Sequence, residues 1–351
     1  MRLILLILTA TVLVACAGRP QVTHFSLAAQ QSSPALWPAY PDVPRYQYLG
    51  QLVGEANLVS EHREASRGKR FLSWIAGLQD EAPDVVKLVR PQSGMVDSDT
   101  QRILVTDVGL NAVMVFDEAG GSMDLWYQAD QQQMFVAPIG IVKISPDEFL
   151  VSDAELGRLV RLSATGQPLG SISSEQLIRP SGMVFDAVED RIYVADTAAD
   201  DIKVFSPQGV LVDVLGESGE AIGQFNAPTH LALDGNRLIV SDTLNARLQL
   251  LTIDGGLVGT VGERGLFVGN FVRPKGVAAD TDGNIYAVES YFDHLLVYDN
   301  EGKLLLSIGG TGDAVGQFYL PAGVWVDSRD RVFIADMHNG RVVVLQYLGS
   351  T

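Results

Sequence analysis

Short apolar runs recur along residues 91–348, in six copies about 46 residues apart. In each copy a proline opens the first run, a second run ends on an acidic residue, and a third run such as VMVF or IKVF follows. The prolines are Pro91, Pro138, Pro180, Pro228, Pro274 and Pro321. The acidic residues are Asp107, Asp153, Asp196, Asp242, Glu289 and Asp336. Apolar runs of this length, bounded by turn residues, predict β-strands.

A repeat of this period, built from short strands and turns, is typical of a β-propeller. We therefore expect an all-β fold over residues 45–351, a six-bladed β-propeller of four-stranded antiparallel blades. The blades should start near residues 91, 138, 180, 228, 274 and 321. An isolated blade would expose two apolar faces, and stacking in a ring buries both of them.

The sixth repeat has no outer strand of its own, because its third run ends near Tyr347. An open ring would leave unpaired strand edges, so we expect an N-terminal strand to complete the last blade. Residues 46–53 and residues 71–75 are both candidates, and the sequence does not separate them.

Three of the segments that lead into the next blade share the pattern G-x-F-x-x-P, at residues 223–228, 269–274 and 316–321. The proline restricts the backbone before the inner strand. We expect the phenylalanine to pack between neighbouring blades.

The N-terminus predicts a secretion signal. Arg2 gives a positive start, and residues 3–14 are largely apolar. Twelve residues of helix rise about 18 Å, less than the roughly 30 Å core of a bilayer, so a membrane span is not expected. The run Leu13-Val14-Ala15-Cys16 resembles a bacterial lipobox. This resemblance implies that residues 1–15 are removed and that Cys16 is acylated, and Ala17 in the next position resembles the pattern of an outer-membrane destination.

Residues 16–44 contain five prolines and no apolar period, which predicts a lipidated cysteine followed by a flexible tether. Such a chain reaches about 30 Å. Residues 61–70 carry a basic cluster of Arg63, Arg67, Lys69 and Arg70. This cluster is either a solvated loop or a contact for lipid headgroups or an acidic partner.

The chain is acidic, with a net charge of −17 over 351 residues, while 47% of its residues are hydrophobic. The apolar fraction supports a large core. An acidic surface repels phosphate backbones, so we expect no nucleic-acid partner. Cys16 is the only cysteine, which excludes an internal disulfide.

The third repeat reads PSGMVFD at residues 180–186, RIYVAD at 191–196 and IKVF at 202–205. With the N-x-R element at residues 245–247 and 339–341, this pattern resembles the NHL repeat family, and the whole chain resembles bacterial NHL-repeat lipoproteins. The resemblance covers residues 91–348 and implies the same six-bladed frame. The sequence departs from it at residues 143–145, where an acid is usual, at His230, where glycine is usual, and at Glu289, where aspartate is usual.

The recurring acids could form a ring of ligands. They could also close the second strand of each blade by accepting hydrogen bonds from turn amides and a nearby arginine. Because a single site would not need all six, we expect a structural role.

Propellers commonly use the mouth of the central channel, near the starts of the inner strands. The candidate binding residues there are Gln92, Ser181, Thr229, His230 and Lys275. Two enzyme families with similar frames, the peptidyl-hydroxyglycine lyases and the gluconolactonase-like proteins, bind a divalent metal at this place. A single histidine at such a position does not make a zinc site, and no short catalytic motif is found, so we expect no catalytic residue, no metal and no cofactor.

These observations favour a protein that is lipid-anchored in the cell envelope, at the outer membrane, with its propeller in the periplasm or at the cell surface. It would bind a protein or glycan partner without catalysis; the partner and the oligomeric state stay open. The alternative is a channel-mouth enzyme of the lactonase-like or peptidyl-hydroxyglycine-lyase-like type that uses a divalent metal. Three or more ionisable side chains converging at one mouth would favour the enzyme.

Replacing Cys16 by serine removes the thiol that acylation requires. We expect Cys16→Ser to abolish incorporation of labelled palmitate and to release the protein from membranes. Fractionation of cells that express each form measures this. Unchanged membrane association of the variant would contradict the predicted anchor.

Overall fold

The structure is a computed structural model that describes residues 23–27, 35–60, 85–173 and 177–349. Strands and turns dominate these ranges, which also contain two 3-10 helices, η2 (Glu55–Asn57) and η3 (Thr243–Asn245). Within the same ranges, no helix is long and apolar enough to cross a bilayer. Cys16, the basic cluster at residues 61–70 and the candidate strand at residues 71–75 lie outside the described residues.

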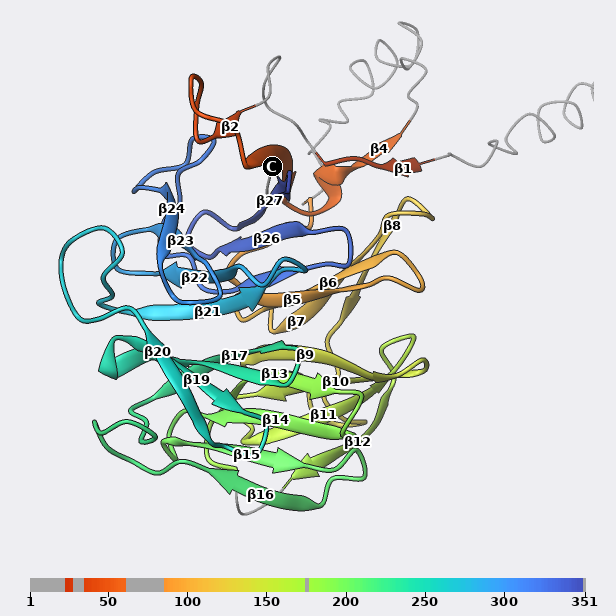
Figure 1. The fold of residues 1–351 in the computed structure, drawn as a ribbon. Helices are drawn as coiled ribbons and strands as arrows, with labels where there is room; N and C mark the ends of the chain where they lie inside the picture. The colour runs from red at the N-terminus through yellow and green to blue at the C-terminus, as the bar shows by residue number, and fades with distance from the viewer. Residues whose placement is uncertain (1–22, 28–34, 61–84, 174–176, 350–351) are drawn as a thin grey trace, which may run out of the picture.

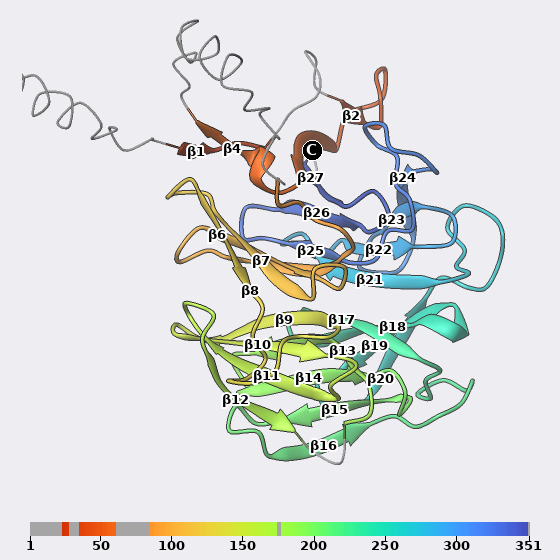
Figure 2. The same cartoon turned by 180° about the vertical axis from the view of Figure 1, so that it is seen from behind.

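Five of the blades in the described chain are four-stranded antiparallel sheets, with strands in chain order from the inner edge outward. Blade 1 consists of β5 (Pro91–Asp97), β6 (Arg102–Asp107), β7 (Ala112–Asp117) and β8 (Ser122–Trp126). Blade 2 consists of β9 (Pro138–Ser145), β10 (Glu148–Asp153), β11 (Arg158–Ser163) and β12 (Pro168–Ser173). Blade 3 consists of β13 (Pro180–Asp186), β14 (Arg191–Asp196), β15 (Asp201–Phe205) and β16 (Leu211–Leu215). Figure 2 shows these three blades in orange, yellow and green.

The other three blades contain the last three of the six repeats. Blade 4 consists of β17 (Pro228–Asp234), β18 (Arg237–Asp242), β19 (Arg247–Thr252) and β20 (Leu257–Val261). Blade 5 consists of β21 (Pro274–Ala279), β22 (Ile285–Glu289), β23 (His294–Tyr298) and β24 (Leu304–Gly309). Blade 6 has five strands in the order β25 (Val324–Val326), β26 (Arg331–Asp336), β27 (Arg341–Tyr347), β3 (Tyr46–Leu52) and β2 (Leu36–Trp37).

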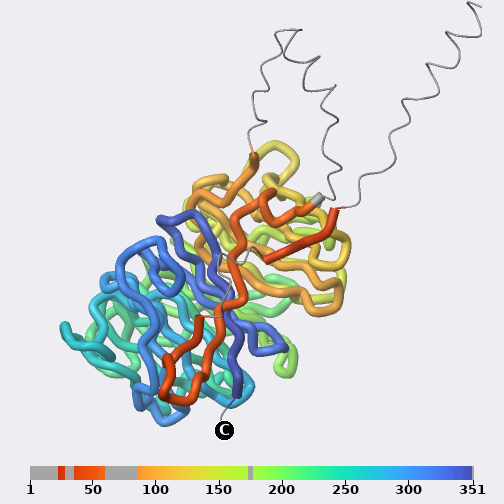
Figure 3. The backbone as a smooth tube through the Cα atoms, turned by 90° about the horizontal axis from the view of Figure 1, so that it is seen from above, coloured from red at the N-terminus to blue at the C-terminus, as the bar shows by residue number. Residues whose placement is uncertain are grey.

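The last blade is closed by β3, which pairs antiparallel with β27 from Val342↔Leu52 to Tyr347↔Tyr46. The candidate segment at residues 46–53 is therefore the closing strand. Seen from above, the red N-terminal segment runs between the blue C-terminal blades and the orange first blade (Figure 3). Each inner strand contacts the inner strands of both neighbouring blades, including β25 with β5, so the ring is closed. The predicted six-bladed, four-stranded fold is confirmed.

Parts of the range expected as a tether, residues 16–44, are paired as strands. Thr23–Phe25 forms β1 and pairs with β4 (Leu58–Ser60), and β2 adds a fifth strand to blade 6 (Figure 1). The ring of Phe25 contacts Phe116 of blade 1 at a centroid distance of 6.1 Å. The sequence does not predict these strands, because they are too short to show an alternating pattern and their partners lie elsewhere in the chain.

The core is divided among the six seams between neighbouring blades, each filled by its own cluster of buried side chains. The expected phenylalanines, Phe225, Phe271 and Phe318, are fully buried in three of these clusters. The other three seams use the same position, three residues before the proline, and place Leu88, Phe135 and Leu177 there. Each seam thus receives one apolar side chain from the connector that leads into the next inner strand.

Inner strands of neighbouring blades approach so closely that glycine is required. A Cβ atom on Gly140 would lie 2.6 Å from the carbonyl oxygen of Ser181 in the next blade, and one on Gly182 would lie 2.6 Å from the Cα of His230. The same clash would occur at Gly276 and Gly323, at 2.4 and 2.2 Å from backbone atoms of the following blade. The Pro-x-Gly pattern therefore reflects backbone packing around the channel.

The recurring acids occupy equivalent places at the ends of the second strands, where all six are buried. Each accepts hydrogen bonds from backbone amides just before the inner strand of its own blade. Asp107, for example, accepts from Val89 and Arg90 at 2.7 and 3.0 Å, and Glu289 accepts from Val272 and Arg273 at 2.8 and 3.0 Å. The matching amide donors to the other four are those of Val136 to Asp153, Ile178 to Asp196, Asn226 to Asp242 and Tyr319 to Asp336. This geometry ties each second strand to the connector of its blade, as a structural role requires.

We expect Gly323→Ala to destabilise the ring, because its Cβ would overlap the carbonyl oxygen of Gln92 across the seam between blades 6 and 1. The expected loss is about 2 kcal/mol of unfolding free energy. Denaturant unfolding monitored by circular dichroism measures it.

The matched control is Gly259→Ala in β20, where the nearest atom to the new Cβ is a Leu250 methyl carbon at 4.0 Å. This variant should stay within about 0.5 kcal/mol of the parent chain. Equal stability of the two variants would show that the inner strands do not need the glycine.

Candidate functional site

The central channel contains a cavity of about 210 Å³, lined almost entirely by residues of the inner strands. Its lining residues are Ser93, Gly94, Ile141, Gly182, Met183, Val184, His230, Leu231, Ala232, Leu233, Val277, Ala278, Ala279, Val324, Trp325 and Val326. Five blades contribute apolar side chains to the wall. His230 is the ionisable group among these lining residues.

His230 occupies the position that glycine holds in the other Pro-x-Gly blades. The close packing of a glycine against the backbone of the next blade is therefore interrupted here. Its side chain is 8% exposed, and neither ring nitrogen has a hydrogen-bond partner among the described residues. Burial, and then the positive charge of Lys275, lower the pKa of His230 from 6.5 to about 3. The ring is therefore neutral at physiological pH, with one donor nitrogen and one acceptor nitrogen left unsatisfied.

Lys275 is the second residue of β21, the adjacent inner strand, and follows Pro274. Burial, and then the charge of Arg273, lower the pKa of Lys275. The described residues provide no hydrogen bond or ion pair to its ammonium group. A partly buried cation close to an unpaired histidine is a favourable place for an anion, because an anion would pair with the ammonium group and accept a hydrogen bond from the donor nitrogen of the ring.

Trp325 is a channel residue that the sequence did not single out. It is 7% exposed, it stacks on Phe333 at a centroid distance of 5.5 Å, and its indole nitrogen has no hydrogen-bond partner among the described residues. It is the aromatic residue of β25, and the available sequence signal was its place in an inner strand, two residues after Gly323. Trp325 adds a second unsatisfied donor to the same cavity.

Two of the sequence candidates have their hydroxyl groups engaged between blades. The hydroxyl of Ser181 lies 2.7 Å from the hydroxyl of Thr197 and 2.9 Å from the carbonyl oxygen of Thr229. The hydroxyl of Thr229 lies 2.7 Å from that of Thr243, which donates to the carbonyl oxygen of Pro274 in the next blade. These groups link neighbouring blades near the mouth and do not line the cavity.

Gln92 is also outside the cavity lining; its side-chain amide donates to the carbonyl oxygen of Arg90 at 3.3 Å. Of the five candidates, His230 alone lines the cavity. Lys275 is also absent from the lining, but it lies close enough for its charge to act on His230. Ser181 and Thr229 link the blades of the frame.

The chemistry available at the mouth is binding of an acceptor-rich or anionic group. Both ionisable groups are nitrogen bases, and no described carboxylate is bonded to either one. In the described ranges, no group of three or more His, Cys, Asp or Glu side chains is placed to hold a metal ion. The convergence that would favour a metal-dependent enzyme is not seen in this part of the chain.

Comparisons with known proteins support the fold. A catalytically inactive virginiamycin B lyase from Staphylococcus aureus, solved with quinupristin, is 12% identical over 74% of this chain and 95% of that chain, with a TM-score of 0.54. A luciferin-regenerating enzyme is 14% identical over 75% and 92%, with a TM-score of 0.57. An auxiliary nutrient binding protein from Bacteroides thetaiotaomicron is 11% identical over 75% and 70%, with a TM-score of 0.59.

No protein-family model matches the chain, and no curated protein sequence matches it either. At such low identity the structural likeness shows the six-bladed frame alone. Because that frame carries a lyase and a binding protein among these examples, it does not select between catalysis and binding.

We expect His230 to stay neutral in the folded protein down to about pH 3. As the pH falls below 6.5, the unfolded chain takes up a proton on this residue and the folded chain does not. Stability contributed by neutral His230 is therefore complete above about pH 6.5 and is lost progressively toward pH 3. Between pH 7.5 and pH 5 the parent chain should lose about 2 kcal/mol relative to His230→Gln.

The ring proton resonances of His230, assigned by their loss in His230→Gln, give the folded pKa directly by NMR. A titration midpoint near 6.5 would show that the ring is solvated or paired with an acid. Unfolding in denaturant at several pH values gives the second, independent measurement.

Proposed function

We propose that this protein is a lipid-anchored β-propeller of the bacterial cell envelope, of the NHL-repeat type, that binds a protein or glycan partner without catalysis. The repeated Pro-x-Gly, acid and third-strand pattern supports the NHL type. The lipobox-like run before Cys16 supports the anchor, and Ala17 supports an outer-membrane location with the propeller in the periplasm or at the cell surface.

The position of β1 shortens the proposed tether. If Cys16 carries the lipid, only residues 17–22 separate it from Thr23, which is already paired with Ser60. A fully extended chain spans at most about 3.5 Å per residue, so the propeller would stay within about 25 Å of the lipid surface. A partner would therefore be bound close to the membrane.

The observation that carries the proposed binding role is the unsatisfied pair at the channel mouth. His230 is buried without a hydrogen bond, and Lys275 has no described partner for its charge. Leaving such groups unpaired is unfavourable, and an incoming acceptor recovers that free energy. A carboxylate matches both groups, because it is anionic and accepts several hydrogen bonds. We propose that the partner presents a carboxylate, either an acidic side chain or a uronic acid.

The alternative is an enzyme that works at the same mouth. A neutral buried histidine next to a lysine with a lowered pKa is a pattern found at acid–base sites. Among the described residues, no acid is bonded to His230 to orient its ring, as such an enzyme would need. We rank the enzyme second for that reason.

We expect the propeller to bind polyglutamate or polygalacturonate, which carry the two proposed kinds of carboxylate. Lys275→Gln should weaken binding about tenfold or more, because a charge-assisted contact is lost. Since a bound anion favours charged Lys275, affinity should fall as the pH rises through the lowered pKa of this lysine. Isothermal titration calorimetry measures both effects.

Lys303→Gln is the matched control, because Lys303 is an exposed lysine in the turn before β24 of the same blade. Equal binding by the two lysine variants, or no binding of either polymer by the parent chain, would refute the carboxylate-binding site proposed at the channel mouth. Appearance of shortened polymer in the same incubations would favour the enzyme instead.

A further inference from the structure

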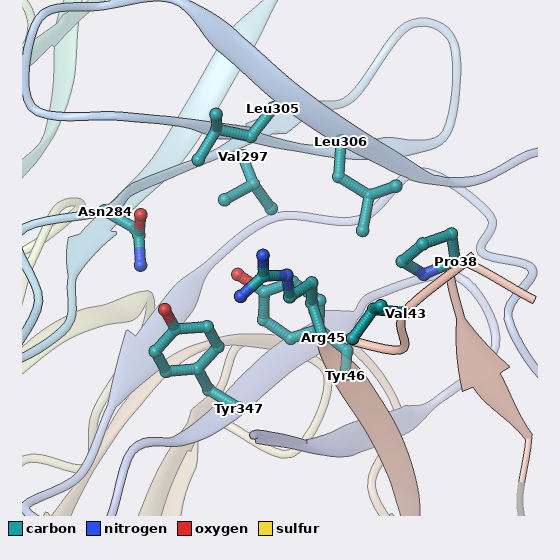
Figure 4. Close-up of a pocket in the computed structure, with 9 residues that line it drawn as sticks. All are labelled: Pro38, Val43, Arg45, Tyr46, Asn284, Val297, Leu305, Leu306 and Tyr347. Carbon is teal, nitrogen blue, oxygen red and sulfur yellow. The ribbon is translucent and has the colours of Figure 1, made fainter. Parts of the chain in front are cut away.

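A second and larger cavity lies away from the channel, in the outer part of the seam between blades 5 and 6. Its volume is about 440 Å³. Blade 5 forms one wall with β23, β24 and the turn before β22. The other wall is β3 with the preceding β2–β3 loop, and Tyr347 at the end of β27 completes it (Figure 4). The cavity exists because the borrowed strand brings a loop with it, which overhangs the seam.

One side of this cavity is apolar. Leu305 and Leu306 of β24 face Pro38 and Val43 of the loop, with Val297 between the two ends (Figure 4). Leu305 is 51% exposed and Val43 is 59% exposed, so this surface is open to solvent. An apolar molecule that fills the groove would remove this surface from water, which is favourable.

The other side carries the guanidinium of Arg45, which points into the cavity near Tyr46 and Asn284 (Figure 4). One of its nitrogens donates to the carbonyl oxygen of Gly349 at 3.0 Å. No carboxylate in the described part of the chain forms an ion pair with it. A guanidinium has five N–H donors, so Arg45 keeps donors without a partner among the described residues, and it lines the cavity.

The tyrosines beneath Arg45 do not neutralise its charge. Tyr286 donates to the carboxylate of Asp280 at 2.6 Å, and its oxygen lies 3.1 Å from the hydroxyl of Tyr46. The proton of Tyr286 is used on Asp280, so Tyr46 must be the donor in the second contact. Burial raises the pKa of Tyr46 and of Tyr286, and both stay protonated. These two tyrosines therefore provide no anionic partner for Arg45.

We infer that this cavity binds a small carboxylic acid with an apolar body, with the carboxylate on Arg45 and the body along Leu306, Pro38 and Val43. The volume lies within the range of small-molecule sites, which are mostly apolar with a few placed polar groups. A bidentate carboxylate is the anion that a guanidinium recognises best by shape. The bound molecule would bridge the N-terminal loop and blade 5 across the seam that closes the ring, so it should stabilise the folded chain. This site is separate from the channel and does not depend on the function proposed for it.

The test uses octanoate as the probe and octylamine, of equal chain length and opposite charge, as the comparison ligand. We expect octanoate to bind and to raise the melting temperature of the full chain, while octylamine does neither. Arg45→Gln should weaken octanoate binding about tenfold or more. Arg191→Gln on blade 3 makes the same change at an arginine that bonds only to nearby carbonyl oxygens, and it should bind octanoate like the parent chain.

Because Arg45 also bonds to Gly349, a second variant separates binding from folding. Val43→Glu places a negative charge at the exposed rim of the cavity without removing a buried contact, and it too should weaken octanoate binding by repulsion. Equal affinities of octanoate and octylamine, or undiminished octanoate binding in both Arg45→Gln and Val43→Glu, would overturn the inference.

Discussion

Close approach of the six inner strands around a narrow axis is the constraint on which this structure depends. At Gly140, Gly182, Gly276 and Gly323 the backbone of the next blade occupies the space of a side chain. The seams then widen outward, and each receives one apolar side chain from the connector, such as Phe225 or Leu88. The buried acids hold those connectors in register by accepting their amide protons. Repeating this arrangement six times leaves no free inner edge.

The two candidate sites lie where this repeated arrangement is interrupted. His230 replaces a seam glycine, and it introduces a buried imidazole without a hydrogen-bond partner among the described residues into the channel. Blade 6 takes its outer strand from the other end of the chain, and the loop before β3 creates the outer cavity around Arg45. Departures of this kind are informative, because real proteins tend to break local structural rules at functional sites.

Most of the frame could be predicted from the sequence because its signals are local. The prolines, the acids and the apolar runs recur within each repeat, so the number of blades and the order of strands within them follow from the pattern. The choice of the closing strand could not be predicted, since residues 46–53 meet their partner β27 only through a pairing between opposite ends of the chain. The short strands β1 and β2 were missed for the same reason. The G-x-F-x-x-P pattern does not include Leu88 and Leu177, although they hold the same position as its phenylalanine, three residues before the proline.

The candidate sites were less accessible to sequence analysis. His230 and Lys275 could be selected because they are polar, reactive side chains at the starts of inner strands in adjacent blades. Ser181 and Thr229 have the same sequence signal, but their hydroxyl groups find partners in the neighbouring blade, and only coordinates reveal those partners. The outer cavity combines Arg45, Asn284 and Leu306, which are far apart in the chain and share no motif.

β3 is an integral strand of blade 6, and native-state hydrogen exchange of the β3 amides in the intact chain tests this most directly. If β3 closes the ring, the amides of β3 that bond to β27 will exchange with the same opening free energy as those of β26, because both open only when the ring unfolds. Exchange of the β3 amides orders of magnitude faster than that of β26, at equal pH and temperature, would contradict closure by the N-terminal strand.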